Sequence, residues 1–242
     1  MLHVRIATSV VGRRSGPPRS FDDTNVDRSM NAALPIPTLT GRLVRLDPMT
    51  LDALDDLVAA ASEDRSTYGF TRVPATKAAM SAHVEELLEG WANGECVPFV
   101  QVDATTGRIV GATRFLTIRR VSPQQPPFAV EVGGTWLAAS AQRSGINVEA
   151  KLLLLEYAFS TWSVGRVDIK TDARNERTRA AIERLGASYE GTLRHWQPSL
   201  AAGEEDRLRD SAMFSVTEDE WPSVQAHLIA RLSGVRRDRA PR

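Results

Sequence analysis

The sequence has 242 residues, of which 42% are hydrophobic and 25% charged, as in an ordinary globular protein with a packed core. Its 30 basic and 30 acidic residues cancel to a formal net charge of +0, which argues against binding of nucleic acid or an anionic membrane by bulk attraction. The single cysteine, Cys96, excludes an internal disulfide and fits a cytoplasmic location, and no apolar run is long enough to span a membrane.

The ends of the chain differ in pattern from its middle. Residues 1–37 show neither helical nor strand periodicity and predict a disordered extension; Met30 is an alternative start, so residues 1–29 are an uncertain part of the native chain. A folded domain is predicted over residues 38–232, followed by a basic tail at 233–242.

Apolar periodicity and turn residues predict a mixed order of elements within this domain. In chain order these are a strand at 42–46, helices at 51–58 and 77–91, strands at 98–102, 108–118 and 129–137, a helix at 148–162, a strand at 166–171, a helix at 175–185, strands at 189–193 and 211–216, and a helix at 221–232. The sequence therefore predicts a single domain of the mixed α/β class.

The segment from 131 to 152 passes from a strand through a loop of small and polar residues into the long helix. A helix N-terminus presents free backbone N–H groups and a partial positive charge, so this turn can bind an anion. Gly145 permits unusual backbone angles there, and Asn147 is a good helix N-cap. The P-loop and dinucleotide glycine motifs are absent, and the local pattern fits an ordinary strand–helix turn equally well.

The spacing Gln142-x-x-Gly145-x-Asn147 resembles the Q/R-x-x-G-x-G/A acyl-CoA loop of the GCN5-related N-acetyltransferase (GNAT) family. The wider sequence resembles the RimJ/RimL-like ribosomal-protein-alanine branch of this family. The matching stretches are 132–137, 145–151, 172–175, 180–187 and 190–194. The resemblance implies a mixed central sheet with splayed middle strands flanked by helices. Asn147 departs from the usual small residue.

The resemblance also implies an acyl-CoA site, in which the backbone N–H of Leu137 polarises the thioester carbonyl and so has a catalytic role. The cofactor-binding residues that it implies are Leu137, Gln142, Arg143, Ser144, Gly145, Ile146, Asn147, Val148 and Asn175. Two of them also have a structural reading: Arg143 as a solvated surface residue, and Asn175 as a plain N-cap.

The acid–base groups are less well marked. Glu131 is the first candidate for a catalytic base, since strand alternation would place 131, 133, 135 and 137 on one face; its alternative role is a rim salt bridge. The helix after Asn175 lacks the tyrosine with which many relatives protonate the thiolate. His195 is a candidate substrate-binding residue or a surface histidine. The acidic loop 204–206 could attract a cationic amine, or could simply be solvated.

The resemblance implies an enzyme, an N-acyltransferase that moves an acetyl or succinyl group from acyl-CoA, without a metal, to a primary amine of a protein N-terminus or a small molecule. The acceptor stays open. A non-catalytic acyl-CoA-binding regulatory module is the alternative, and a nucleotide-binding protein of another class is a third. Neither nucleic acid nor a membrane is expected as a partner. The protein is expected to be a monomer or a homodimer.

Overall fold

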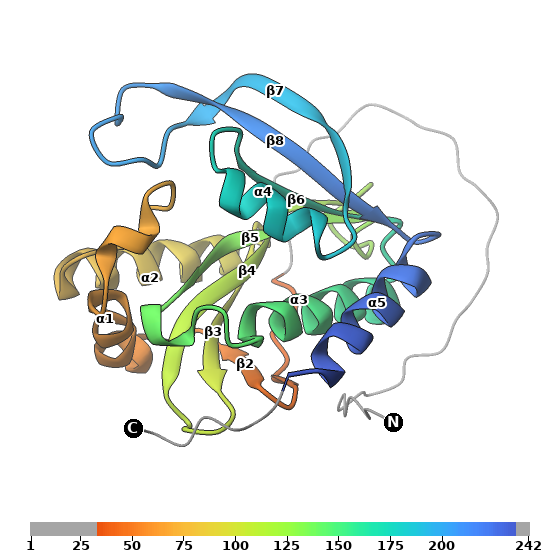
Figure 1. The fold of residues 1–242 in the computed structure, drawn as a ribbon. Helices are drawn as coiled ribbons and strands as arrows, with labels where there is room; N and C mark the ends of the chain where they lie inside the picture. The colour runs from red at the N-terminus through yellow and green to blue at the C-terminus, as the bar shows by residue number, and fades with distance from the viewer. Residues whose placement is uncertain (1–32, 236–242) are drawn as a thin grey trace.

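One mixed sheet of eight strands runs through the middle of the described structure, in the order β1-β2-β3-β4-β5-β6-β8-β7 (Figure 1). The computed structural model describes residues 33–235, so the predicted extension up to 32 and the tail from 236 lie outside the described residues. The strands are β1 (Leu39–Thr40), β2 (Val44–Pro48), β3 (Val97–Asp103), β4 (Ile109–Arg119), β5 (Ala129–Leu137), β6 (Arg166–Asp172), β7 (Ser188–Pro198) and β8 (Leu208–Thr217).

Helices connect several of these strands, and one more helix follows the last strand. They are α1 (Leu54–Ser62), α2 (Lys77–Ala92), α3 (Ile146–Glu156), α4 (Glu176–Glu183) and α5 (Trp221–Ser233), with short 3-10 turns η1 (Leu51–Ala53), η2 (Arg65–Tyr68) and η3 (Ala139–Ala141) and a π-helical turn η4 (Tyr157–Thr161). The predicted order of helices and strands is confirmed, and with it the mixed α/β class.

The helices cover both faces of the sheet. On one face, Trp136 of β5 meets Tyr68 edge-on beside α1 and α2, with ring centroids 6.1 Å apart. On the other face, Phe115 of β4 packs against Tyr157 and Trp162 at the end of α3. Antiparallel pairing sets alternate side chains on opposite faces, so β4 and β5 are covered from both sides.

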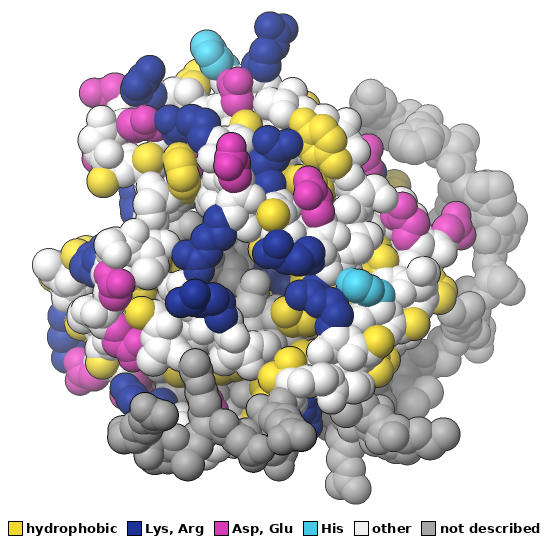
Figure 2. Space-filling view, viewed as in Figure 1, with side chains coloured by type: hydrophobic (Ala, Val, Ile, Leu, Met, Phe, Trp, Pro, Cys, Tyr) yellow, Lys and Arg dark blue, Asp and Glu magenta, His cyan; other side chains and the backbone are white. Residues whose placement is uncertain are grey.

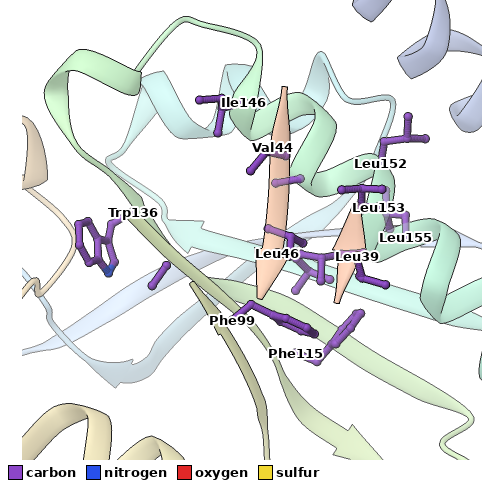
Figure 3. Packing of buried hydrophobic residues seen from close by; sticks show 14 of the residues in the cluster. Leu39, Val44, Leu46, Phe99, Phe115, Trp136, Ile146, Leu152, Leu153 and Leu155 are labelled. Carbon is purple, nitrogen blue, oxygen red and sulfur yellow. The ribbon is translucent and has the colours of Figure 1, made fainter. Parts of the chain in front are cut away.

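The core lies mainly between α3 and the first strands. Figure 3 shows Leu152, Leu153 and Leu155 of α3 beside Leu39 and Leu46 of β1 and β2, all of them buried. Burial of a leucine side chain contributes about 1.5–3 kcal/mol each. This packing holds the N-terminal end of α3 in a fixed place beside the C-terminal end of β5.

The middle strands β5 and β6 are parallel and separate along their length. They pair only from Ala129 to Glu131 on β5 and from Arg166 to Asp168 on β6, while β5 continues to Leu137 and β6 to Asp172. The last six residues of β5 therefore face β4 on one side and no described strand on the other. This is the splayed pair that the resemblance implies.

A β-bulge interrupts β5 and changes which side chains share a face. Between Ala112 and Arg114 of β4, the residues Gly134 and Thr135 together face Thr113. Gly134 has φ +57°, and a Cβ there would lie 2.8 Å from Cζ of Arg114. The prediction that 131, 133, 135 and 137 share one face is therefore wrong, because the extra residue turns Thr135 to the face opposite Glu131.

The boundary of α3 also differs from the prediction. The helix begins at Ile146, and Gly145 takes the N-cap position with φ 92°. Asn147 is therefore a residue of the first turn and not the predicted cap. At its other end the chain widens into the π-helical turn η4.

Packing begins before the predicted domain boundary at 38, because Leu34 and Ile36 contact the core and Nε1 of Trp91 donates a 2.7 Å hydrogen bond to the carbonyl of Leu34.

Candidate active site

The open edge of β5 ends at Leu137. The backbone of Leu137 faces the gap, which is the space between β5 and β6 beyond the point where the two strands separate. The N–H of Ala138 donates to the carbonyl of Val110 on the β4 side. Hydrogen-bonded and non-hydrogen-bonded pairs alternate along antiparallel strands, so the next pair, Gly111 with Leu137, is a non-hydrogen-bonded one. The N–H and C=O of Leu137 therefore point away from β4, toward the side from which β6 has diverged.

The loop after β5 is held by the side chain of Gln142. Its Nε2 donates to the carbonyl of Leu137 at 3.1 Å and to Oγ1 of Thr67 at 3.1 Å, and its Oε1 accepts from Arg177 of α4 at 2.8 Å. Gln142 thus links three parts of the chain, namely the end of β5, the turn η2 that precedes α2, and the helix α4. These contacts hold the loop after β5 in place.

Gly145 is required by both the backbone and the packing of this loop. Its φ of 92° is one that L-residues rarely adopt, and a Cβ would lie 2.9 Å from Cδ1 of Leu43. Ser144 closes the turn, since its Oγ donates to the carbonyl of Ala141 at 2.5 Å and accepts from the N–H of Ile146 at 3.4 Å. The loop thus enters α3 without steric conflict.

The first N–H groups of α3, at Ile146, Asn147 and Val148, have no intrahelical acceptors because they belong to the first turn. Arg143, with φ 60°, is exposed in the loop before them. Figure 2 shows Lys and Arg side chains gathered near the middle of this face, where α4 and the start of α3 lie. The neutral net charge of the chain thus coexists with a local basic region suited to phosphate.

Glu131 lies at the last paired position of β5, where the gap begins. Its side chain is 5% exposed, and its Oε2 accepts hydrogen bonds from Lys170 of β6 at 2.5 Å and from Thr117 of β4 at 3.1 Å. Both donors use Oε2, which leaves Oε1 as the oxygen for a further proton. Glu131 thus forms a salt bridge, as its alternative reading predicts. The Glu131–Lys170 pair is, however, largely buried and does not lie at a rim.

Lys151 is a buried titratable residue beside the candidate site that the sequence interpretation did not single out. It lies on α3, is 5% exposed, and donates from Nζ to Oγ1 of Thr135 at 2.7 Å, which in turn lies 2.8 Å from Oγ1 of Thr113. Burial lowers the pKa of the Lys151 ammonium to about 7, and the negative charge of Glu131 offsets part of this shift. An amine that titrates near neutral pH therefore lies directly under the bulge of β5.

The other predicted site residues have more ordinary surroundings. Asn175 is the N-cap of α4, and its Oδ1 accepts from the N–H of Thr178 at 3.0 Å. Ile182 is buried in α4, where the expected tyrosine is absent. His195 is exposed on β7 with φ 47°, and its backbone N–H donates to Asp210. The structure gives its imidazole no contact with the gap.

Within the acidic loop 204–206, Glu204 is paired with a cation, while Glu205 and Asp206 are exposed. Both carboxylate oxygens of Glu204 accept from Arg174 at 2.8 Å, and Arg174 also binds the buried carboxylate of Asp172. The hydrogen bonds of Arg174 and then of Ser199 lower the pKa of Glu204 to about 2. Arg174 also lies over the ring of Phe70, 5.3 Å from its centroid, so it joins three segments beside the gap.

The described residues hold neither a cluster of metal ligands nor a helix suited to span a membrane. Over residues 33–235, the His, Cys, Asp and Glu side chains form no group of three or more that could hold a metal ion. In the same range, no helix has the length and apolar character needed to cross a bilayer.

Comparisons with known proteins agree with this geometry. The Acetyltransferase (GNAT) domain family matches residues 43–188. No curated protein matches the sequence significantly. A protein of T. thermophilus described as a candidate acetyltransferase is 33% identical, with a TM-score of 0.68 over 83% of this chain and 98% of its own. A GCN5-related N-acetyltransferase from Brucella melitensis is 27% identical, with a TM-score of 0.70 over 84% and 88%.

The fold is shared more widely. RimJ of Mycobacterium smegmatis, solved in complex with CoA-disulfide, is 20% identical, with a TM-score of 0.65 over 78% of this chain and 88% of that one. The family match covers more than half of the sequence and includes β5, the loop after it and α3. The chain therefore belongs to the GNAT family of N-acetyltransferases.

Proposed function

We propose that this protein transfers an acyl group, acetyl or succinyl, from acyl-CoA to a primary amine of a protein N-terminus or a small molecule. The observation that carries the proposal is the placement of Leu137. Its backbone faces the open edge of β5, one short loop before the N-terminus of α3. A thioester in the gap can pair with that edge while its nucleotide phosphates lie at the helix end.

The phosphates of CoA fit the loop 143–148. The N–H groups of the first turn of α3 point out of the helix, and the exposed Arg143 adds a positive charge. Gly145, with φ 92°, lets the loop turn into α3 beside Leu43 and so places these N–H groups. The CoA-disulfide complex of M. smegmatis RimJ supports a site of this kind in a protein of the same fold.

The chemistry follows from the groups at the gap. The acceptor amine loses a proton to Oε1 of Glu131, and its nitrogen attacks the thioester carbonyl. The N–H of Leu137 stabilises the oxyanion that forms, an effect typically worth about 3 kcal/mol. The C–S bond then breaks, and the thiolate takes its proton from solvent or from another group, since α4 supplies no tyrosine.

Lys170 and Thr117 hold Glu131 in place for this step. Both bind Oε2, so Oε1 is oriented by two contacts from neighbouring strands. Gly133 leaves room beside it, because a Cβ there would lie 3.2 Å from Oε1. A small residue at this point gives the amine space to reach the carboxylate.

Two measurements test the proposal. Calorimetry with CoA should show saturable binding, and its absence at high micromolar ligand would contradict an acyl-CoA enzyme. A mass-spectrometric screen of amines and peptide N-termini with acetyl-CoA and succinyl-CoA should reveal acylated products. Binding of CoA with no accelerated thioester cleavage by any amine would instead favour the non-catalytic regulatory module.

A further inference from the structure

Arg209, on β8, is a buried cation with no partner among the described residues. The residue is 7% exposed, its Nε is buried without a hydrogen bond, and none of the ion pairs in residues 33–235 uses its guanidinium. Burial lowers its pKa, and the charges of Asp172 and Glu131 partly offset this. A buried Nε–H without an acceptor is costly, which suggests that a ligand supplies what the chain does not.

Ser211 lies two residues further along the same strand and also has a buried polar atom without a hydrogen-bond partner. It is 0% exposed, and its Oγ is buried with no hydrogen-bond partner. Residues i and i+2 of a strand lie on one face, so the side chains of Ser211 and Arg209 leave the sheet on the same side. Two adjacent unsatisfied polar groups on one face are unusual in a native structure.

This face is the one that carries the proposed base. Glu131 pairs with Asp168 of β6, and Asp168 pairs with Ser215 of β8, so these three share a face of the sheet. Two-residue steps along β8 from Ser215 lead to Ser211 and then to Arg209. The two groups therefore lie on the same side of the sheet as Glu131, beyond the point where β5 and β6 separate.

The two carboxylates whose charges act on Arg209 already have other cationic partners. Asp172 is bound by Arg174 at 2.7 Å, and Glu131 by Lys170 at 2.5 Å. Arg174 adds a repulsive positive charge to Arg209. The uncompensated charge on this face is therefore positive, and it suits an anion and not the ammonium that a free acidic loop would attract.

We propose that Arg209 and Ser211 bind a carboxylate of the substrate, carried either by the acyl group or by the amine acceptor. The proposal rests on the proposed function. A planar guanidinium donates to a carboxylate in a fixed fork, and the serine hydroxyl can donate to an oxygen of the same group. The burial of Nε of Arg209 and Oγ of Ser211 favours a small planar anion over a phosphate.

Paired substrates separate the two sources of the carboxylate. In one arm, succinyl-CoA and acetyl-CoA are compared with a common amine; in the other, amino acids are compared with their carboxamides, with acetyl-CoA as donor. In one of the two arms, the substrate that carries the carboxylate should have a kcat/KM about 10- to 100-fold higher than the substrate without it. This is the range expected for a hydrogen bond to a charged group. Arg209→Met should abolish that preference, and Ser211→Ala should reduce it.

Arg194→Met is the matched control, since Arg194 is exposed on the neighbouring strand β7 and should leave the preference unchanged. Arg209→Met removes an unpaired buried charge, so it should fold and should bind CoA as the wild type does. A transfer activity with no carboxylate preference, or a preference that persists in Arg209→Met, overturns this inference alone.

A binding experiment decides the inference even if no transfer is found. Succinate titrated into the wild-type protein by calorimetry should bind saturably, and at least tenfold more weakly to Arg209→Met. Equal binding to the two proteins, or none to the wild type, overturns the carboxylate site. Failure of CoA to bind overturns the proposed function, so the two failures are distinct.

Discussion

Nζ of Lys151 donates to Oγ1 of Thr135 at 2.7 Å, which joins the buried side of α3 to the bulge of β5. The ammonium is thus held beneath the strand whose open edge ends at Leu137. Its burial has a consequence for stability that depends on pH, because the same lysine is fully solvated in the unfolded chain.

Lys151→Met should raise the free energy of unfolding most at low pH. The pKa is about 7 in the folded protein and near 10.5 unfolded, so below pH 7 the folded state bears the full cost of a buried charge. Between pH 7 and 10.5 the wild type grows more stable as its folded form loses the proton. The gain should be on the order of a few kcal/mol at pH 6 and should vanish near pH 10.

Urea denaturation of both proteins at pH 6, 8 and 10 measures this difference. Lys77→Met is the control, because the Lys77 side chain is 64% exposed and pairs only with an exposed Asp55. A Lys151→Met variant that is less stable than wild type at pH 6 would contradict the expectation.

Glu131→Gln should lower kcat by about 10²- to 10⁴-fold, the usual contribution of a general base, and leave the affinity for CoA unchanged. It also leaves Lys170 as a buried charge without its partner, which is expected to cost about 3–5 kcal/mol of stability. Activity loss and unfolding must therefore be separated.

The double variant Glu131→Gln with Lys170→Met removes both charges and makes that separation. It should recover most of the lost stability in thermal melting and none of the lost kcat. Full activity in either variant would exclude Glu131 as the base.

The sequence predicts the loop and misses the polar groups that need tertiary context. Gln142 and Gly145 were recognisable because their motif is local. The adjacent Gly133 and Gly134 carried a signal for the bulge, since glycine inside a strand pattern often marks one. Strand alternation alone could not include that extra residue, so Thr135 was assigned to the wrong face.

Lys151 and Arg209 could not be identified from pattern alone. Lys151 adjoins a run of leucines on α3, and only the packing of the helix shows that it points at Thr135. The predicted strand began at Ser211, which left Arg209 in a loop where an arginine is unremarkable. The structure begins β8 at Leu208 and so turns Arg209 into the face of Glu131.

Gly145→Ala should weaken both the fold and CoA binding. An alanine at φ 92° costs about 1–2 kcal/mol, and its Cβ would lie 2.9 Å from Leu43, so the loop must shift. Because the first N–H groups of α3 follow directly, the affinity for CoA should fall at least tenfold. Gly203→Ala has a similar φ of 80° with no atom within 4 Å, and should cost stability without affecting CoA.

Arg174→Met should destabilise the protein increasingly as pH rises from 4 to 7. In the wild type, burial would raise the pKa of Asp172, but the hydrogen bonds and charge of Arg174 bring it below its ordinary value of 3.8. The stability from this pair is therefore present above about pH 4 and is lost as pH falls further. Without Arg174, burial dominates, the folded pKa rises, and ionisation of Asp172 opposes folding.

The stability difference between wild type and Arg174→Met should thus be smallest near pH 3–4 and largest near pH 7, where it is expected to reach about 2–4 kcal/mol. Arg207→Met serves as the control, because the Arg207 side chain is 75% exposed and lies 3.9 Å from Glu204. Denaturant melts of the three proteins across this range give the answer. A difference that stays constant with pH would mean that Arg174 contributes packing over Phe70 and not charge compensation for Asp172.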